Sequence, residues 1–253
     1  MHLSSLKYIK TFLLDLIFPR FCLGCQKEMA SKQSVLVCDA CFGKITLNSG
    51  VQCHICGLRI SVPEGHKKCH KKTPLRGLFA ASHYENPILK EMIHRFKYQS
   101  VESLKKPLAE LIIAYIAKEL LIDKLANSVL VPIPLTLKRK INRGFNQSEL
   151  LAKEIGKFLN CPVINLLKRK KFTSPQAEIS DWQKRKENIS GAFCLNPKLI
   201  GSGNQSDQSD QSGLKKVILV DDVSTSGATL EEAARVLIQA GIEEIYGLVV
   251  AKG

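Results

Sequence analysis

Residues 217–230 read VILVDDVSTSGATL: four apolar β-formers, two adjacent acids, and a loop of small polar residues. Four consecutive aliphatic residues of this kind are typical of a strand buried on both faces. The apolar periodicity of residues 230–239, followed by Gly241, predicts a helix directly after the loop. The order strand, loop, helix favours an α/β protein that binds a ligand at the carboxyl end of a parallel strand.

The loop after the two acids has the features of a sugar-phosphate site. Its candidate phosphate ligands are the hydroxyls of Thr225, Ser226 and Thr229, together with the backbone N–H groups of these residues and of Gly227 and Ala228. They lie where a helix begins, which favours an anion, and a glycine lets the backbone approach closely. Asp221 and Asp222 can accept hydrogen bonds from vicinal ribose hydroxyls. The alternative is a helix-capping acid pair followed by an ordinary turn.

Two other nucleotide-binding classes are not indicated by this loop. The GxxxxGKS/T spacing of a nucleoside triphosphatase loop and its lysine are absent, and so is the GxGxxG spacing of a dinucleotide-binding turn. The remaining interpretation is a site for one phosphorylated sugar.

Outside this stretch, strand and helix patterns alternate, which predicts a mainly parallel sheet flanked by helices. The expected strands are residues 78–84, 129–133, 217–220 and 245–251, with a short extended segment at 189–195. The expected helices are residues 87–96, 101–121, 147–159 and 230–239. The run GSGNQSDQSDQSG, residues 201–213, has nothing to pack and is expected to be a flexible loop.

Seven of the nine cysteines lie within residues 22–69, and six of these form three CxxC pairs. Two cysteines so close in sequence make a poor structural disulfide but a good metal-binding turn, which favours a reducing compartment and a cytoplasmic location. We therefore expect an amphipathic helix over residues 1–20, a Cys-rich module over 21–73 and an α/β domain over 74–253. Cys161 and Cys194 lie outside the module and are interpreted as small buried hydrophobes.

The cysteine spacing predicts zinc. The first set, with twelve residues between two CxxC turns, is Cys22, Cys25, Cys38 and Cys41. The second set is Cys53, Cys56, His66 and Cys69, in which a histidine stands where a cysteine would complete the pattern. His54 or His70 could compete for that position, and iron–sulfur binding is the weaker alternative. Since no position looks open for substrate, we expect structural zinc, one or two ions.

The net charge of +14 comes in basic clusters, at residues 67–72, 138–143, 168–171 and 184–186. Such clusters suit a phosphate-rich partner, although each could be a solvated face. Residues 3–18 are apolar at helical spacing but are interrupted by Lys7, Lys10 and Asp15. This favours a helix that packs on the protein's own body, with no signal peptide and no membrane insertion.

The 217–230 stretch resembles the phosphoribosyl pyrophosphate motif of type I phosphoribosyltransferases. Two more stretches resemble the ComF family of competence-related phosphoribosyltransferase-like proteins: VPIPLTLKRKINRGFNQSELLA, residues 131–152, and SPQAEISDWQKRKENISGAF, residues 174–193. The resemblance extends to the Cys-rich start and to NPILKEMIHRFKY, residues 86–98. It implies a type I phosphoribosyltransferase-like α/β fold with a small N-terminal double zinc ribbon.

The resemblance also assigns roles to residues. It implies that Asp221 and Asp222 hold the ribose hydroxyls of phosphoribosyl pyrophosphate or ribose 5-phosphate, while the loop of residues 225–229 binds the 5-phosphate. The loop after Pro134 would be the pyrophosphate loop, and its candidate cations are Lys138, Arg139, Lys140 and Arg143. A flexible loop over residues 175–185 would cover the site, with Arg185 reaching the leaving pyrophosphate.

Two functions remain open at this stage. In one, the protein is a phosphoribosyltransferase in which a nucleophile attacks the ribose C1 while pyrophosphate departs, neutralised by magnesium and the basic loops. In the other, the pocket is a ligand-binding site, and the protein acts in natural transformation with single-stranded DNA and other competence proteins, as the resemblance implies. Aromatic residues make up only 6% of the chain and are scattered, so DNA contact would be mostly to the backbone.

Overall fold

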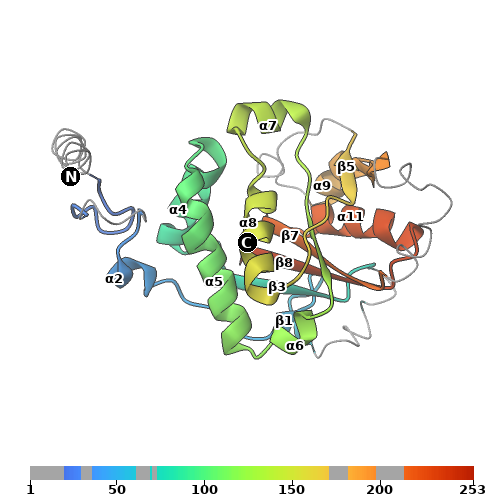
Figure 1. Cartoon of the computed structure of the whole chain (residues 1–253), viewed down its shortest axis with the longest axis horizontal. Coiled ribbons are helices and arrows are strands. Elements are labelled where there is room, and N and C mark those ends of the chain that lie inside the picture. The colour runs from blue at the N-terminus through green and yellow to red at the C-terminus, as the bar shows by residue number, and fades with distance from the viewer. Residues whose placement is uncertain (1–19, 30–35, 61–68, 70–72, 171–181, 198–213) are drawn as a thin grey trace, which may run out of the picture.

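The computed structural model describes residues 20–29, 36–60, 69, 73–170, 182–197 and 214–253 (Figure 1). The amphipathic helix expected over residues 1–20 and the loop expected over residues 201–213 therefore lie outside the described residues, apart from Arg20.

A six-stranded sheet forms the centre of the molecule, with strand order β2-β1-β3-β8-β7-β4. Strands β3, β8, β7 and β4 are parallel, while β1 and β2 extend one edge in the antiparallel sense. The strands are β1 (Val51–Gln52), β2 (Arg59–Ile60), β3 (Gly77–His83), β4 (Val129–Pro132), β7 (Lys216–Ser224) and β8 (Glu244–Lys252). A separate antiparallel pair consists of β5 (Leu167–Arg169) and β6 (Phe193–Leu195). The expected mainly parallel sheet is confirmed.

Helices cover both faces of this sheet (Figure 1). The described helices are α2 (Asp39–Phe42), α4 (Pro87–Tyr98), the 3₁₀ turn η1 (Glu102–Leu104), α5 (Lys105–Lys118), α6 (Ile122–Leu125), α7 (Leu137–Arg143), α8 (Gln147–Leu159), α9 (Trp182–Ile189) and α11 (Ala228–Gln239). On one face, α4, α5 and α8 share a core with Ile218 and Val220 of β7. On the other, α9 and α11 share a core with Val217 and Leu219.

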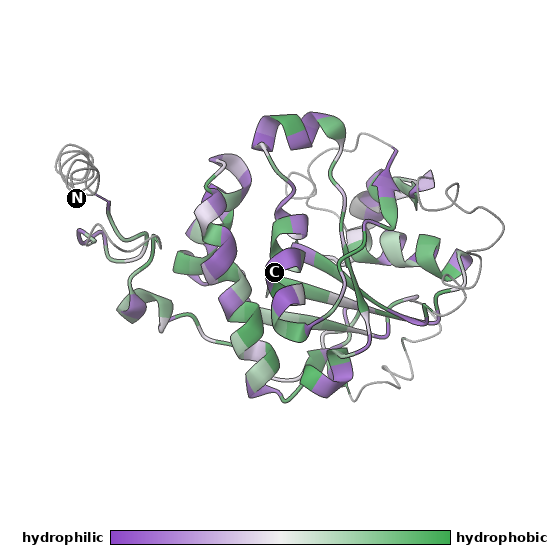
Figure 2. Cartoon of the chain, in the orientation of Figure 1, coloured by the Kyte–Doolittle hydropathy of each residue, from purple (hydrophilic) through white to green (hydrophobic). Residues whose placement is uncertain are grey.

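The alternation of β7 between two cores explains why residues 217–220 of this strand are all apolar. Successive side chains of a strand point to opposite faces, so a strand covered on both faces needs apolar residues throughout. Residues 217–220 are all fully buried. Figure 2 shows the same arrangement as hydrophobic central strands between helices that are hydrophilic on their outer sides. The core thus holds β7 rigidly up to the two acids.

The Cys-rich segment packs against the body of the molecule. Cys22, Cys41 and Ile45 are buried in the core that α4 and α5 share, and the amide of Asn86 donates a 3.3 Å hydrogen bond to the carbonyl of Lys44. Through β1 the segment also joins the main sheet, because Gln52 pairs with Leu78. The first and second halves of the segment therefore contact the domain at different places.

Four expectations about local structure need correction. Strand β7 continues to Ser224, so the acids lie within the strand and not after it. The basic stretch expected as a loop is helix α7, because Thr136 caps it with a 3.3 Å hydrogen bond from the amide of Arg139. The expected helix over 101–121 is divided into η1 and α5. In the expected extended segment at 189–195, helix α9 ends at Ile189 and strand β6 begins only at Phe193.

Candidate functional site

The acid pair lies within the central strand β7, close to its carboxyl end. Ser224, the last residue of β7, pairs with Lys252 of β8, and Asp221 pairs with Val249. Asp222 is buried, with 5% of its surface exposed, and Asp221 is partly buried. A carboxylate removed from water needs a compensating charge or hydrogen bond, and helices α8 and α4 provide both.

Each acid has one partner from a different helix. The hydroxyl of Ser148, in the first turn of α8, donates a 2.8 Å hydrogen bond to Asp221 Oδ1. The Nζ atom of Lys97, in the last turn of α4, lies 2.8 Å from Asp222 Oδ1. The two acids are also linked, because the backbone N–H of Asp222 donates to Asp221 Oδ1 over 2.9 Å. Two carboxylates therefore share one ammonium group.

The pKa values reflect this imbalance of charge. Burial, together with the charge of Asp222, raises the pKa of Asp221 to about 6, and the nearby Lys97 only partly offsets the shift. Burial alone would lower the pKa of Lys97, but its contact with Asp222 outweighs burial and raises that pKa. Near neutral pH the site thus holds a closely packed, net negative pair that hydroxyl donors or cations would stabilise.

The loop after β7 leads directly into the N-terminus of α11. Gly227 has a φ of +77°, which is the left-handed region that favours glycine. Gly227 has no side chain to cap the helix, and the Ser226 hydroxyl accepts a 3.4 Å hydrogen bond from the backbone N–H of Ala228. A cavity of about 40 Å³ is lined by Asp221 and by residues 223–230. The hydroxyl of Ser224 is buried beside it without a hydrogen-bond partner among the described residues, so donors are available here for a bound anion.

The basic helix α7 contributes cations near the acids. Arg139 and Arg143 are four residues apart and share one face of α7, whereas Lys138 lies about 100° around the helix from Arg139. The Arg143 guanidinium lies 5.2 Å from the ring centre of Tyr98 and donates a 3.2 Å hydrogen bond to the Gln147 side chain. These contacts hold α7 against α4 and α8, which also carry the partners of the acids.

A further cation, Arg169 at the end of β5, joins this group. Burial, and then the positive charge of Arg139, lower the pKa of Arg169 to about 10; Arg143 acts in the same direction, while Asp221 opposes the shift. These mutual effects mean that the three guanidinium groups and the acid lie within electrostatic range of one another. The expected cation Arg185 lies on α9, but its side chain is outside the described residues.

The first cysteine cluster has the geometry of a four-thiolate metal site. The sulfur atoms of Cys22, Cys25, Cys38 and Cys41 all lie within 4.8 Å of one another. Burial would raise the pKa of Cys22, but backbone N–H groups of the knuckles outweigh it and lower that pKa to about 6. Burial and the neighbouring thiols raise the pKa of Cys41 to about 12. Four close sulfurs cannot all ionise without a cation, so the set fits structural zinc.

The second cluster brings together the sulfur atoms of Cys53, Cys56 and Cys69, again within 4.8 Å. The expected fourth ligand, His66, lies outside the described residues, and so does His70. His54 does not belong to the cluster: its Nε2 lies 3.0 Å from Thr73 Oγ1 and 3.3 Å from Glu231 Oε1. Three of the four positions needed for a tetrahedral zinc site are therefore in place.

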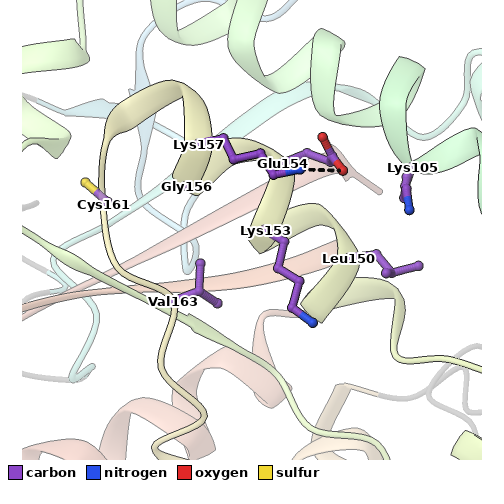
Figure 3. Close-up of a pocket in the computed structure, with 8 residues that line it drawn as sticks. All are labelled: Lys105, Leu150, Lys153, Glu154, Gly156, Lys157, Cys161 and Val163. Atoms are coloured by element: carbon purple, nitrogen blue, oxygen red, sulfur yellow. Dashed lines mark hydrogen bonds and ion pairs between the residues drawn. The ribbon is translucent and has the colours of Figure 1, made fainter.

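A separate cavity of about 570 Å³ lies beside α8, away from the acid pair (Figure 3). Three lysines line it, but each is bound to a glutamate: Lys105 to Glu102 at 2.6 Å, Lys153 to Glu149 at 2.7 Å and Lys157 to Glu154 at 3.5 Å. Because the positive charges are already compensated, this cavity is a poor anion site, and its lysines are suitable control positions.

Three residues of the site, Lys97, Ser148 and Arg169, were not predicted from the sequence, although the first two left a signal in it. The buried stripe of α4 is Leu89, Met92, Ile93 and Phe96. Lys97 follows Ile93 by four residues, so a lysine falls at the edge of an apolar face. Ser148 similarly continues the buried stripe of α8 at Leu151, Ala152 and Ile155. For Arg169, the third residue, the sequence shows only one cation among several neighbouring cations.

Comparison with known proteins defines the class and then the family. A family model described as phosphoribosyl transferase domain matches residues 100–253, and one described as double zinc ribbon domain matches residues 13–72. The chain is therefore a phosphoribosyltransferase-domain protein with an N-terminal double zinc ribbon. It is 31% identical over 229 residues to competence protein F of Haemophilus influenzae, a match that covers 88% of this chain and 93% of the relative.

Two further relatives agree. DNA utilization protein YhgH of Escherichia coli K12 is 27% identical over 233 residues, covering 89% of this chain and 94% of the relative. Competence protein ComFC of Bacillus subtilis is 29% identical over 217 residues, covering 81% of this chain and 79% of the relative. The chain belongs to the ComF family. Among the described residues, no helix is long and apolar enough to cross a membrane.

Proposed function

We propose that the end of β7 and the start of α11 form a binding site for phosphoribosyl pyrophosphate or ribose 5-phosphate. The observation that carries this proposal is the adjacency of two features: a buried, net negative acid pair and a helix N-terminus with an unpartnered buried hydroxyl. The acid pair suits hydroxyl donors, and the helix start suits an anion. A ribose 5-phosphate carries both groups at opposite ends of one small molecule.

In this proposal Asp221 and Asp222 accept hydrogen bonds from the ribose hydroxyls, and residues 225–229 bind the 5-phosphate. Lys97 limits the repulsion between the two acids, as its 2.8 Å contact with Asp222 supports. Arg139 and Arg143 face the pyrophosphate, together with Lys138 on the same helix, and Arg185 of α9 is the further candidate cation for it. Magnesium, when bound with the ligand, supplies positive charge to the pyrophosphate oxygens.

We further propose a role in natural transformation and DNA use in the cytoplasm. The names of the relatives, competence protein F and DNA utilization protein YhgH, support this role, and the reduced cysteine clusters suit the compartment. Single-stranded DNA would contact the exposed basic surface of α7, with other competence proteins as further partners. Such contact should weaken steeply as salt is raised, because phosphate contacts release counterions.

The first test is calorimetry with ribose 5-phosphate and with magnesium phosphoribosyl pyrophosphate. Replacing both acids, Asp221→Asn with Asp222→Asn, should weaken binding by at least about tenfold, since two carboxylate acceptors for the ribose hydroxyls are lost. Lys153→Ala, in the cavity of Figure 3, is the control and should bind as the wild type does. Unchanged affinity in the double variant would remove the acid pair from the proposed site.

The same preparation separates a transferase from a ligand-binding protein. Release of pyrophosphate from phosphoribosyl pyrophosphate is measured in the presence of a panel of bases and amines. In a transferase, the bond between the ribose C1 and the pyrophosphate oxygen breaks as the acceptor nitrogen bonds to C1 and loses its proton. Binding without pyrophosphate release for every acceptor would favour the ligand-binding function, and release that depends on one acceptor would favour the enzyme.

A further inference from the structure

His54 belongs to the second cysteine knuckle by sequence but contacts the phosphate loop in space. It follows Cys53 directly, yet it is not part of the cluster of three sulfur atoms, and its side chain is only 2% exposed. Its Nε2 lies 3.3 Å from Oε1 of Glu231, in the first turn of α11, and 177 residues separate the two in the chain. Thr73 Oγ1, 3.0 Å from the same nitrogen, completes the contact.

The ring of His54 also fills the space behind Gly227. A Cβ atom added to Gly227 would lie 2.9 Å from His54 Cδ2, closer than real side chains approach. Glu231, the hydrogen-bond partner of His54, donates its own backbone N–H to the carbonyl of Gly227 over 2.9 Å. One imidazole ring therefore contacts the phosphate loop at its left-handed glycine and at the first turn of α11.

The other end of the same knuckle approaches the neighbouring strand. A Cβ atom added to Gly57, the residue after Cys56, would lie 3.6 Å from Lys252 Nζ. Lys252 pairs with Ser224, the last residue of β7. The turn that carries two metal ligands thus lies beside α11 at His54 and beside the Lys252 side chain of β8, the strand that pairs with β7, at Gly57.

Within the knuckle, two backbone hydrogen bonds close the turn that carries His54. The amide of Cys53 donates to the carbonyl of Leu58 over 2.8 Å, and the amide of Gly57 donates to the carbonyl of Cys53 over 2.8 Å. Such a small turn has little core of its own, so metal ligation decides whether it is ordered. Fixing Cys53 and Cys56 fixes the backbone of His54 between them.

We infer that the second zinc knuckle positions the phosphate loop through His54, so that metal ligation by Cys53, Cys56 and Cys69 and anion binding at residues 225–229 are coupled. His54 is a positioning residue in this scheme, because it touches Gly227 and Glu231 and not the anion. The coupling is reciprocal: a bound phosphate must raise the metal affinity of the second site by the factor by which metal raises phosphate affinity. The affinity part of this inference rests on the proposed phosphate site, whereas the contact with the loop does not.

The two clusters provide a matched pair of variants. Cys25 and Cys56 are the exposed cysteines of the first and second clusters, and Cys25→Ser and Cys56→Ser each remove one ligand. Amide hydrogen exchange of residues 225–231 is measured without ligand, and the dissociation constants of inorganic phosphate and ribose 5-phosphate are measured by calorimetry. We expect Cys56→Ser to speed amide exchange in this segment and to weaken the binding of both ligands by about tenfold, which is within the usual range of coupling energies. Cys25→Ser should change neither.

A second pair separates His54 from the metal itself. His54→Ala removes both the ring and the hydrogen bond to Glu231, whereas His54→Phe keeps the packing against Gly227. With zinc content unchanged, His54→Ala should reproduce the effects of Cys56→Ser, and His54→Phe should recover part of the lost affinity. Exchange and affinity in His54→Ala that equal those of the wild type would overturn the inference, as would equal effects of Cys25→Ser and Cys56→Ser.

These outcomes are distinct from failure of the proposed function. If the wild-type protein binds neither ligand, the sugar-phosphate proposal fails, while exchange at residues 225–231 still tests the contact with His54. If exchange responds to His54→Ala but binding does not depend on Asp221 and Asp222, positioning of the loop stands and the ribose assignment falls.

Discussion

At the scale of single residues, the site is defined by two buried carboxylates that share one ammonium group. Burial, together with the charge of Asp222, raises the pKa of Asp221 to about 6 from its ordinary value of 3.8. A raised folded-state pKa means that the contribution of Asp221 to stability is complete below about pH 4 and is lost as the pH rises through about 6. The acid pair therefore lowers the stability of the ligand-free protein near neutral pH.

Asp221→Asn should accordingly stabilise the ligand-free protein at pH 7.5 by about 1 kcal/mol, which would raise its melting temperature by a few degrees. In the wild type, ribose 5-phosphate affinity should rise between pH 5.5 and 7.5, because the ionised carboxylate is the better hydroxyl acceptor. Titration of the ligand's own phosphate contributes equally in both proteins, so calorimetry of the variant isolates the Asp221 component. The same pH dependence in wild type and variant would contradict this assignment.

Lys97 provides the second prediction at this scale. Lys97→Met leaves Asp222 buried without its cation and should lower the free energy of unfolding by about 3 kcal/mol. Because the cost comes from the stranded carboxylate, adding Asp222→Asn should restore much of the stability. Urea unfolding of both single variants and the double variant measures this coupling. Additive losses would show that the 2.8 Å contact contributes little.

At the scale of elements, α7 is the unusual helix, since none of its residues is buried. Its apolar residues Leu137 and Ile141 are 74% and 70% exposed, so burial of an apolar face does not account for its position. What holds it is polar: the Thr136 cap, and the contacts of Arg143 with Tyr98 and Gln147. A helix attached in this way presents its cations at the site with little contribution to the core.

Replacing Arg139 and Arg143 by alanine should therefore weaken the binding of magnesium phosphoribosyl pyrophosphate by about tenfold. The binding of ribose 5-phosphate should weaken much less, because only the first ligand carries a pyrophosphate. Calorimetry with both ligands measures the difference, with Lys153→Ala combined with Lys157→Ala as the charge-matched control. Single-stranded DNA affinity at low salt should fall in the same variant, as measured by fluorescence anisotropy. Equal losses for both sugar phosphates would place the arginines elsewhere than at the pyrophosphate.

At the scale of the whole molecule, the two cysteine clusters contact different parts of one domain. The first shares the core of α4 and α5, and the second lies beside the start of α11. Metal removal should thus affect the two regions separately: the first cluster supports the core on one face of the sheet, and the second supports the proposed phosphate site.

We expect two zinc ions per chain by elemental analysis and a lower melting temperature after treatment with a strong chelator. Cys25→Ser should lower the melting temperature more than Cys56→Ser, because Cys22 and Cys41 of the first cluster are buried in the main core. Differential scanning fluorimetry of both variants measures this order. One zinc ion per chain in the wild type would show that the second cluster lacks its fourth ligand.

The sequence by itself determined the features that depend on neighbouring residues. Three features are local patterns that the structure contains: the apolar run at 217–220, the helix boundaries at Gln147 and Leu159, and the spacing of the first four cysteines. Local backbone preferences and short-range metal geometry suffice to specify them. The limits of β7 were less predictable, because pairing with β8 carries the strand through two acids that propensity would place in a loop.

Only the tertiary structure decided which distant side chains meet. Ser148 and Asp221 are 73 residues apart, and His54 and Glu231 are 177 apart, yet both pairs are in hydrogen-bond contact. Such pairs depend on which helix covers which strand. Neither the hydrophobic periodicity nor the composition of the sequence specifies this arrangement. The physical reason is that burial of apolar faces arranges the layers first, and the few polar groups carried inside must then find partners wherever the layers bring them together.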